Sequence, residues 1–136
     1  MTPGFPLPDL TDPLLAPFWA AAAQGELRLP RRTDGTGFDW YPSGAEVEWV
    51  RLPGTGTLYT WSAVMRPLHA GYAAIAPYVV ALVEIDGAPG VRLVTRLLDA
   101  PETLAIGAPV EVRFTDIGTP GPEIGMIGPL FVLRRS

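Results

Sequence analysis

The spacing of apolar residues divides the chain into a short helical segment followed by a long series of strands. Residues 14–24 form an alanine-rich stretch that includes Phe18 and Trp19, and alanine favours the helix more than any other residue. Asp12 is suited to cap the start of this helix. Gly25 is suited to end it, because glycine readily adopts the left-handed conformation found after helix C-termini. We therefore expect one helix over residues 14–24.

After residue 25, apolar and polar residues alternate, which is typical of strands that bury one face. The segment 77–85 differs because it is almost entirely apolar, as expected for a central strand. Asp86-Gly87 indicates a tight hairpin, and residues 101–107 are expected to hold one helical turn. The expected strands cover residues 26–31, 38–41, 46–52, 56–66, 77–85, 91–98, 109–117 and 124–133.

Five of these strands follow residue 54, with the helical turn between the third and the fourth. This is the layout of an OB-fold, a small Greek-key barrel, so we predict a mainly β protein with an N-terminal helix and a five-stranded OB-fold barrel. The period of two assigns five apolar and aromatic residues to the barrel core rather than to a cofactor site: Tyr59, Trp61, Val79, Ala81 and Val83.

The composition excludes several kinds of chemistry. The 136 residues contain no cysteine, and all ten basic residues are arginine. The chain therefore lacks a cysteine nucleophile, a thiolate metal site, a Schiff-base lysine and the lysine of a P-loop. His69 is the single histidine, which is too few for a histidine zinc cluster. We predict that the chain has no catalytic residue and is not an enzyme by itself.

The charge and hydropathy of the chain bear on its partners and its location. Fourteen acidic and ten arginine side chains give a net charge of −4, whereas nucleic-acid binding needs a basic face. Single-stranded nucleic acid, which OB-folds often bind, is therefore a disfavoured alternative. The first residues lack a secretory pattern, and the apolar run 73–83 is too short to cross a membrane. We expect a cytoplasmic protein.

Three stretches resemble a known family in their order and spacing. The first is Asp12–Leu29, with Ala-Pro-Phe-Trp leading into Gly-Glu-Leu, and the second is Gly-Thr-Gly-Thr-Leu-Tyr-Thr-Trp at 54–61. The third is Pro-Tyr-Val-Val-Ala-Leu-Val-Glu-Ile-Asp at 77–86, followed by Ile106-Gly107 and by residues 110–114. Together they resemble the DUF35 family, acyl-CoA-associated proteins with an N-terminal helix, a rubredoxin-like zinc ribbon and an OB-fold.

The resemblance implies domain boundaries and a lost metal site. The family ribbon carries two Cys-x-x-Cys pairs, but here Arg32 and Gly35 stand where the first pair would be, and the second pair is missing. Because structural zinc takes four ligands, we predict no zinc and a shortened, metal-free hairpin in which Phe38, Trp40 and Trp49 pack. The implied units are an extension and helix over residues 1–25, a degenerate ribbon over 26–50 and an OB-fold over 51–136.

The resemblance also implies an accessory role in lipid metabolism. Family members commonly partner thiolase-fold or related enzymes that act on acyl-CoA thioesters, and they supply scaffold, interface and sometimes contacts to CoA. We therefore expect a non-catalytic subunit that partners a thiolase-like enzyme. A stand-alone module that binds acyl-CoA or another small molecule is the alternative.

Aromatic side chains are the candidates for contact with a partner. Large aromatic residues often anchor protein interfaces, which makes Phe18, Trp19 and Trp40 candidate interface residues. The alternative for Phe18 and Trp19 is packing against the chain's own barrel. An exposed Phe18–Trp19 helix would also favour a homodimer where the enzyme partner is absent.

Polar side chains near the barrel ends are the candidates for contact with CoA. Arginine can hold a phosphate and tyrosine can stack on adenine, and loops at barrel ends commonly carry binding. The ordinary alternative is a solvated loop with a surface histidine. Arg92, Arg96 and Arg113 could form a basic patch, but exposed arginines that pair with Glu84 or Glu111 across strands are favoured. The candidates for CoA are Arg66, His69, Tyr72 and Arg96.

Overall fold

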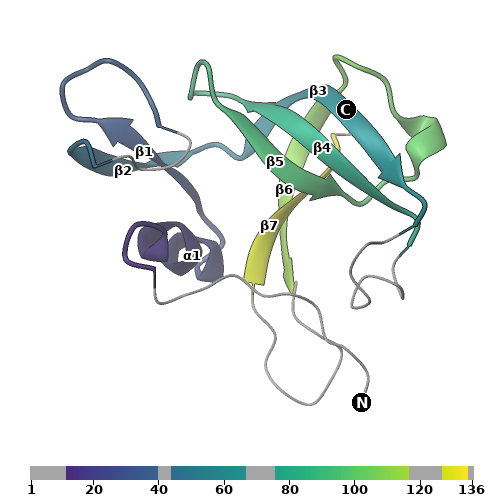
Figure 1. The fold of residues 1–136 in the computed structure, drawn as a ribbon, viewed down its shortest axis with the longest axis horizontal. Helices are drawn as coiled ribbons and strands as arrows, with labels where there is room; N and C mark the ends of the chain where they lie inside the picture. The colour runs from purple at the N-terminus through teal and green to yellow at the C-terminus, as the bar shows by residue number, and fades with distance from the viewer. Residues whose placement is uncertain (1–11, 40–43, 67–75, 117–126, 135–136) are drawn as a thin grey trace, which may run out of the picture.

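The computed structural model describes residues 12–39, 44–66, 76–116 and 127–134. One helix and a two-stranded hairpin lie beside a closed five-stranded barrel (Figure 1). The hairpin precedes the barrel, and a single turn of 3-10 helix, η2, lies between two barrel strands. The elements are α1 (Ala16–Ala23), β1 (Leu27–Arg32), β2 (Val47–Leu52), β3 (Thr55–Val64), β4 (Tyr78–Ile85), β5 (Arg92–Leu97), η2 (Pro101–Thr103), β6 (Pro109–Asp116) and β7 (Ile127–Leu133).

The barrel has the strand order β3-β4-β5-β7-β6, and β3 closes it by pairing with both β4 and β6. All neighbouring strands are antiparallel except β5 and β7, which are parallel. This order, with the short helical turn between the third and fourth barrel strands, is that of an OB-fold. The predicted fold class is therefore confirmed.

Gly56 allows β3 to pair with two neighbouring strands at the same residue. It pairs with Ile85 of β4 on one side and with Val110 of β6 on the other. A Cβ atom at this position would lie 2.3 Å from the backbone carbonyl oxygen of Glu84. Only glycine lets the backbones approach so closely, and the strand can then curve from one sheet edge to the next.

A β-bulge in β3 overturns one core assignment. The register against β4 shifts between Leu58 and Thr60, so that Tyr59 is an extra residue in the strand. Leu58 is fully buried and Trp61 packs against the core, although these two positions have opposite parity. Tyr59 is 41% exposed, so the prediction that its ring belongs to the core is wrong.

The core fills the barrel and continues beneath the β1–β2 hairpin. In β4 the inward positions predicted from the sequence, Val79, Ala81 and Val83, are all buried. Phe131 of β7 is fully buried in the same cluster, and the hairpin contributes Leu27 and Leu29. The β1–β2 hairpin is thus joined to the barrel through shared apolar packing.

The helix begins two residues later and ends one residue earlier than predicted. Asp12 makes no N-terminal cap of the usual kind; its side chain accepts a hydrogen bond from the amide of Leu14, 3.0 Å away. Gly25 has φ of 74°, and its amide and that of Glu26 bond back into the last turn, as in a Schellman motif. The helix packs against β1 and the nearby end of β7 (Figure 1).

Two local expectations are changed by the structure. The expected strand at 38–41 is reduced, within the described residues, to one isolated bridge between Phe38 and Arg31. The tight hairpin expected at Asp86-Gly87 is a longer connection over residues 86–91, because Ala88 and Val91 turn inward and are buried. The helical turn expected within 101–107 is present as η2.

Candidate functional site

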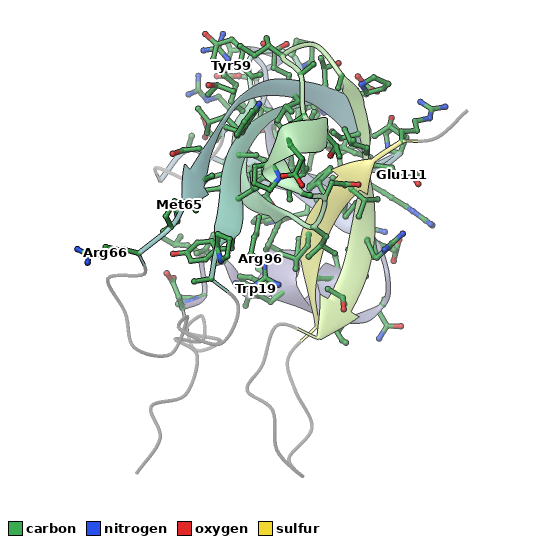
Figure 2. All side chains as sticks on the ribbon, turned by 90° about the vertical axis from the view of Figure 1, so that its right-hand side faces the viewer. Trp19, Tyr59, Met65, Arg66, Arg96 and Glu111 are labelled. Carbon is green, nitrogen blue, oxygen red and sulfur yellow. The ribbon has the colours of Figure 1, made fainter. Side chains whose placement is uncertain are left out.

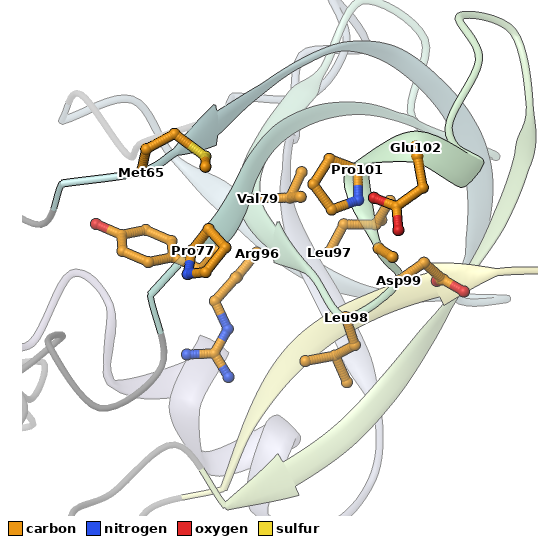
Figure 3. Close-up of a pocket in the computed structure, with 11 residues that line it drawn as sticks. Met65, Pro77, Val79, Arg96, Leu97, Leu98, Asp99, Pro101 and Glu102 are labelled. Atoms are coloured by element: carbon orange, nitrogen blue, oxygen red, sulfur yellow. The ribbon is translucent and has the colours of Figure 1, made fainter.

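A pocket of about 560 Å³ opens where β3 ends, β4 begins and β5 ends (Figure 3). Its base includes Val79 and Leu97, both buried core residues. Pockets that hold small molecules usually combine an apolar lining with a few polar groups, and their volumes are about 300–1,000 Å³. The residues around the opening are Met65, Pro77, Tyr78, Arg96, Leu98, Asp99, Ala100, Pro101 and Glu102.

Arg96 brings a positive charge to this pocket. It lies on β5 opposite Val80 of β4, one residue before the buried Leu97, so the alternation of the strand places it on the outer surface. Within the described ranges, Arg96 forms no ion pair. An arginine in this position can bind an anion beside the apolar pocket lining.

The other predicted ligand residues are not all brought to this pocket. Arg66 is exposed and extends away from the barrel just after Met65 (Figure 2). His69 and Tyr72 lie outside the described residues, so their contact with CoA stays a prediction, as it does for Arg66 and Arg96. Sequence reasoning missed Met65 and Leu98, which are 67% and 40% exposed. No local pattern marks them, because only the fold brings these strand ends together.

The two carboxylates at the pocket have different surroundings. Asp99 accepts a hydrogen bond of 2.7 Å from the amide of Leu133, so it ties the end of β7 to the segment after β5. Glu102 lies in the first turn of η2 and is exposed. Neither side chain caps η2. The described pocket residues combine a cation, carboxylates and apolar surface, and this combination suits the binding of a small molecule.

Arg92 already has interaction partners on the barrel surface. Its guanidinium lies 3.6 Å from a carboxylate oxygen of Glu84 on the neighbouring strand and 3.9 Å from the ring centre of Tyr59. Among the favoured cross-strand pairings, the one between Arg92 and Glu84 is confirmed. Stacking of this cation also explains how the exposed Tyr59 ring is held after the bulge turns it outward.

An ion pair closes the turn that follows β1. Both Nε and Nη2 of Arg32 contact one carboxylate oxygen of Asp39, at 2.7 and 2.6 Å, and Asp39 is only 6% exposed. The hydrogen bond and the negative charge of Asp39 hold the pKa of Arg32 above its ordinary value. The amide of Asp39 also donates to the carbonyl of Pro30.

This arrangement does not suit zinc. The donors at this corner are a guanidinium, which cannot ligate a metal, and a carboxylate already paired with it. No group of three potential metal ligands occurs within the described parts of the chain. Folding without zinc or another cofactor stays a prediction. Phe38 packs against the core and Trp49 is half-buried, whereas Trp40 lies outside the described residues.

The aromatic pair of α1 is partly engaged within the protein. Phe18 packs against the core, and the ring of Trp19 meets it edge-on with centroids 4.9 Å apart. The indole Nε1 of Trp19 is buried and has no hydrogen-bond partner among the described groups. Contact of either ring with a partner stays a prediction.

None of the helices in the described ranges has the length and apolar character needed to span a membrane.

Comparison with known proteins adds relatives that share this fold. A family model described as the C-terminal OB-fold domain of ChsH2 matches residues 49–115. A DUF35 domain-containing scaffold protein of Methanothermobacter thermautotrophicus is 30% identical over 79 residues, which are 57% of this chain and 57% of that protein. A probable enoyl-CoA hydratase alpha subunit of Thermomonospora curvata is 40% identical over 74 residues, 54% of this chain and 20% of that protein.

A second DUF35 domain-containing scaffold protein, from Methanocaldococcus jannaschii, is 34% identical over 79 residues, 57% of this chain and 54% of that protein. The chain thus spans between a fifth and just over half of the length of these curated relatives. Among solved structures, a chain of the Ltp2-ChsH2(DUF35) aldolase has a TM-score of 0.74 and 28% identity, covering 93% of this chain and 98% of that chain. The strand order and these matches agree, and the chain is a DUF35 OB-fold protein.

Proposed function

We propose that this chain is a non-catalytic accessory subunit that binds an enzyme acting on acyl-CoA thioesters, with a partner of thiolase-like fold. The observation that carries the proposal is the match to a chain of the Ltp2-ChsH2(DUF35) aldolase, which extends over 93% of this chain. Two relatives are named as scaffold proteins, which supports the same role.

The side chains of the protein agree with this role. The sequence has neither cysteine nor lysine, so nucleophilic catalysis through either residue would have to come from outside these 136 residues. An ion pair between Arg32 and Asp39 closes the turn after β1, where the family resemblance would place metal-binding side chains. Trp19 lies on α1, which packs beside the hairpin. Its buried indole N–H lacks an acceptor in the described structure.

The test is capture of the partner with the tagged chain from the native host at physiological salt, followed by mass spectrometry. We expect a stoichiometric thiolase-like enzyme whose activity on acyl-CoA or whose thermal stability falls when this chain is withheld. Trp19→Ala should weaken capture, whereas Leu14→Ala, at an exposed position before the helix, serves as the matched control. An enzyme that is fully active and stable without this chain would contradict the proposal.

A second candidate function is a stand-alone module that binds acyl-CoA. The pocket favours it, because Arg96 places a cation beside an apolar base. Calorimetric titration with CoA and with octanoyl-CoA tests this function on the isolated chain. Arg96→Gln should weaken binding at least tenfold, and Arg113→Gln, at an exposed position of β6 that is not part of the pocket lining, should not. Absence of heat at millimolar ligand would rule the module out.

A further inference from the structure

The outer surface of β4 and β5 is more apolar than a solvent-facing sheet needs to be. In antiparallel sheets with one solvated face, outward positions are usually polar. Here Val80 and Leu82 of β4 point outward, between the buried residues Val79, Ala81 and Val83. Leu82 pairs with Val94 of β5, which is 55% exposed. The sequence of β4 is thus apolar on both faces.

The described helix does not cover this surface. α1 packs against β1 and β7, whereas β4 packs mainly against β3 and β5 (Figure 1). We name the β4–β5 outer face by its cross-strand pairs, which are Glu84 with Arg92, Leu82 with Val94, and Val80 with Arg96.

The charges on this face are arranged so that it complements itself. At one end of the face, β4 carries Glu84 and β5 carries Arg92. A two-fold axis that runs along the strands, between β4 and β5, exchanges the two strands between facing copies. Glu84 of one copy then faces Arg92 of the other, and Leu82 faces Val94. In the third row, Arg96 of one copy faces Val80 of the other, at the end of the face that borders the pocket. No like charges meet in any of the three rows.

The existing pair of Glu84 and Arg92 does not oppose this exchange. Its closest approach is 3.6 Å, and each of the two side chains is 51% exposed. Solvent-exposed pairs of this kind contribute only about 0–1 kcal/mol, so they re-pair across an interface at little cost. Two sheets can pack face to face with their strands within about 30° of each other, which this axis allows.

From these observations we infer that the β4–β5 outer face binds a second copy of this chain and forms a two-fold dimer. This inference is independent of the proposed enzyme partner.

The size of the face limits the affinity of the dimer. β4, with eight residues, is about 26 Å long, and β5, with six, is about 20 Å long. At a strand spacing of about 4.8 Å, the two strands offer about 220 Å² of flat surface. A stable interface buries about 800 Å² on each partner, so the dimer should be weak and dependent on concentration.

Analytical ultracentrifugation of the purified chain from about 5 to 500 µM tests the dimer, since weak interfaces of this size have micromolar or poorer affinity. We expect the mean mass to rise from one copy towards two. Val94→Glu should abolish this rise, because a carboxylate would face Leu82 of the second copy. Ile106→Glu, at a 75% exposed residue between η2 and β6, is the matched control and should dimerise normally. Thermal melting checks that both variants stay folded.

Charge exchange tests the two-fold arrangement itself. Glu84→Arg places two arginines opposite each other and should weaken the dimer at least tenfold, whereas the double variant Glu84→Arg with Arg92→Glu should restore it. A wild-type chain that stays monomeric at every concentration would overturn the inference, as would a dimer that tolerates Val94→Glu. The inference would also be overturned if the chain is monomeric and Val94→Glu abolishes capture of an enzyme. That result would assign the face to the enzyme. Failure to capture any enzyme would contradict the proposed function and leave the dimer measurement valid.

Discussion

Gly56 provides a sharp test of how the barrel closes. At this residue β3 pairs with β4 and β6 at once, and its φ angle is one that any residue can adopt. The Gly56→Ala substitution therefore adds only a steric problem. The new Cβ would lie 2.3 Å from the carbonyl oxygen of Glu84 and 2.9 Å from Cγ1 of Val83.

The cost follows from the lack of room to move. An ordinary contact requires β3 and β4 to separate by about 1 Å, against a usual strand spacing of about 4.8 Å. Movement of β3 away from β4 presses it towards Val110 of β6, which is fully buried. Overpacking costs about 1–3 kcal/mol, and we expect about 3 kcal/mol here because the contact is with backbone. For a domain of this size, that lowers Tm by about 10 °C.

Urea and thermal unfolding, followed by circular dichroism, measure this effect. The control is Gly35→Ala in the turn after β1, where a Cβ meets nothing within 4 Å but φ is +82°. That variant carries only the strain of a left-handed conformation, about 1–2 kcal/mol. The reasoning about barrel closure fails if Gly56→Ala is no more destabilising than Gly35→Ala.

Three further predictions concern the core and the turn that follows β1. Phe131→Ala, at a fully buried position that pairs with both β5 and β6, should destabilise the protein by about 3–5 kcal/mol in urea unfolding; a loss below about 1 kcal/mol would mean that Phe131 does not hold the barrel together. Asp39→Asn should lower Tm and speed amide hydrogen exchange around Arg32, because it removes the carboxylate that closes this turn; unchanged exchange would refute that role. Hydrogen bonds from the side chain and the amide of Thr36 hold the pKa of Asp34 below its ordinary value of 3.8. The stability that Asp34 adds is therefore complete above that value and is lost as pH falls through its lowered pKa, so unfolding of wild type and Asp34→Asn should differ near neutral pH and converge in acid.

Much of the fold could be predicted because local signals agree with one another. The nearly continuous apolar run of β4, the alanine-rich stretch of α1 and the glycine after it each indicate the element that forms. The number of strands after residue 54 and the place of the helical turn are enough to indicate an OB-fold. Tyr59 was wrongly assigned to the core because the bulge adds one residue to β3. Inward and outward positions exchange at the bulge, and nothing in the sequence marks this change.

The candidate site was harder to predict. Arg96 was identified as a possible ligand residue from its charge, and the structure does place it at the pocket. Met65 and Leu98 could not be identified, because they are distant in sequence and meet only when β3, β4 and β5 pair. The ion pair between Arg32 and Asp39 was also missed, because nothing in the sequence marks which carboxylate pairs with this arginine.

The sequence by itself determined the alternation of the strands, the absence of cysteine and lysine, and hence the kinds of catalysis that this chain cannot perform. The tertiary structure decided which charges are paired and which apolar surfaces stay outside the core. The physical reason is that periodicity specifies which residues share a face of one strand, whereas register and bulges specify which strands and faces meet. Glu84 and Arg92 are eight positions apart in the sequence, yet the register of β4 and β5 makes them neighbours beside the apolar pair of Leu82 and Val94.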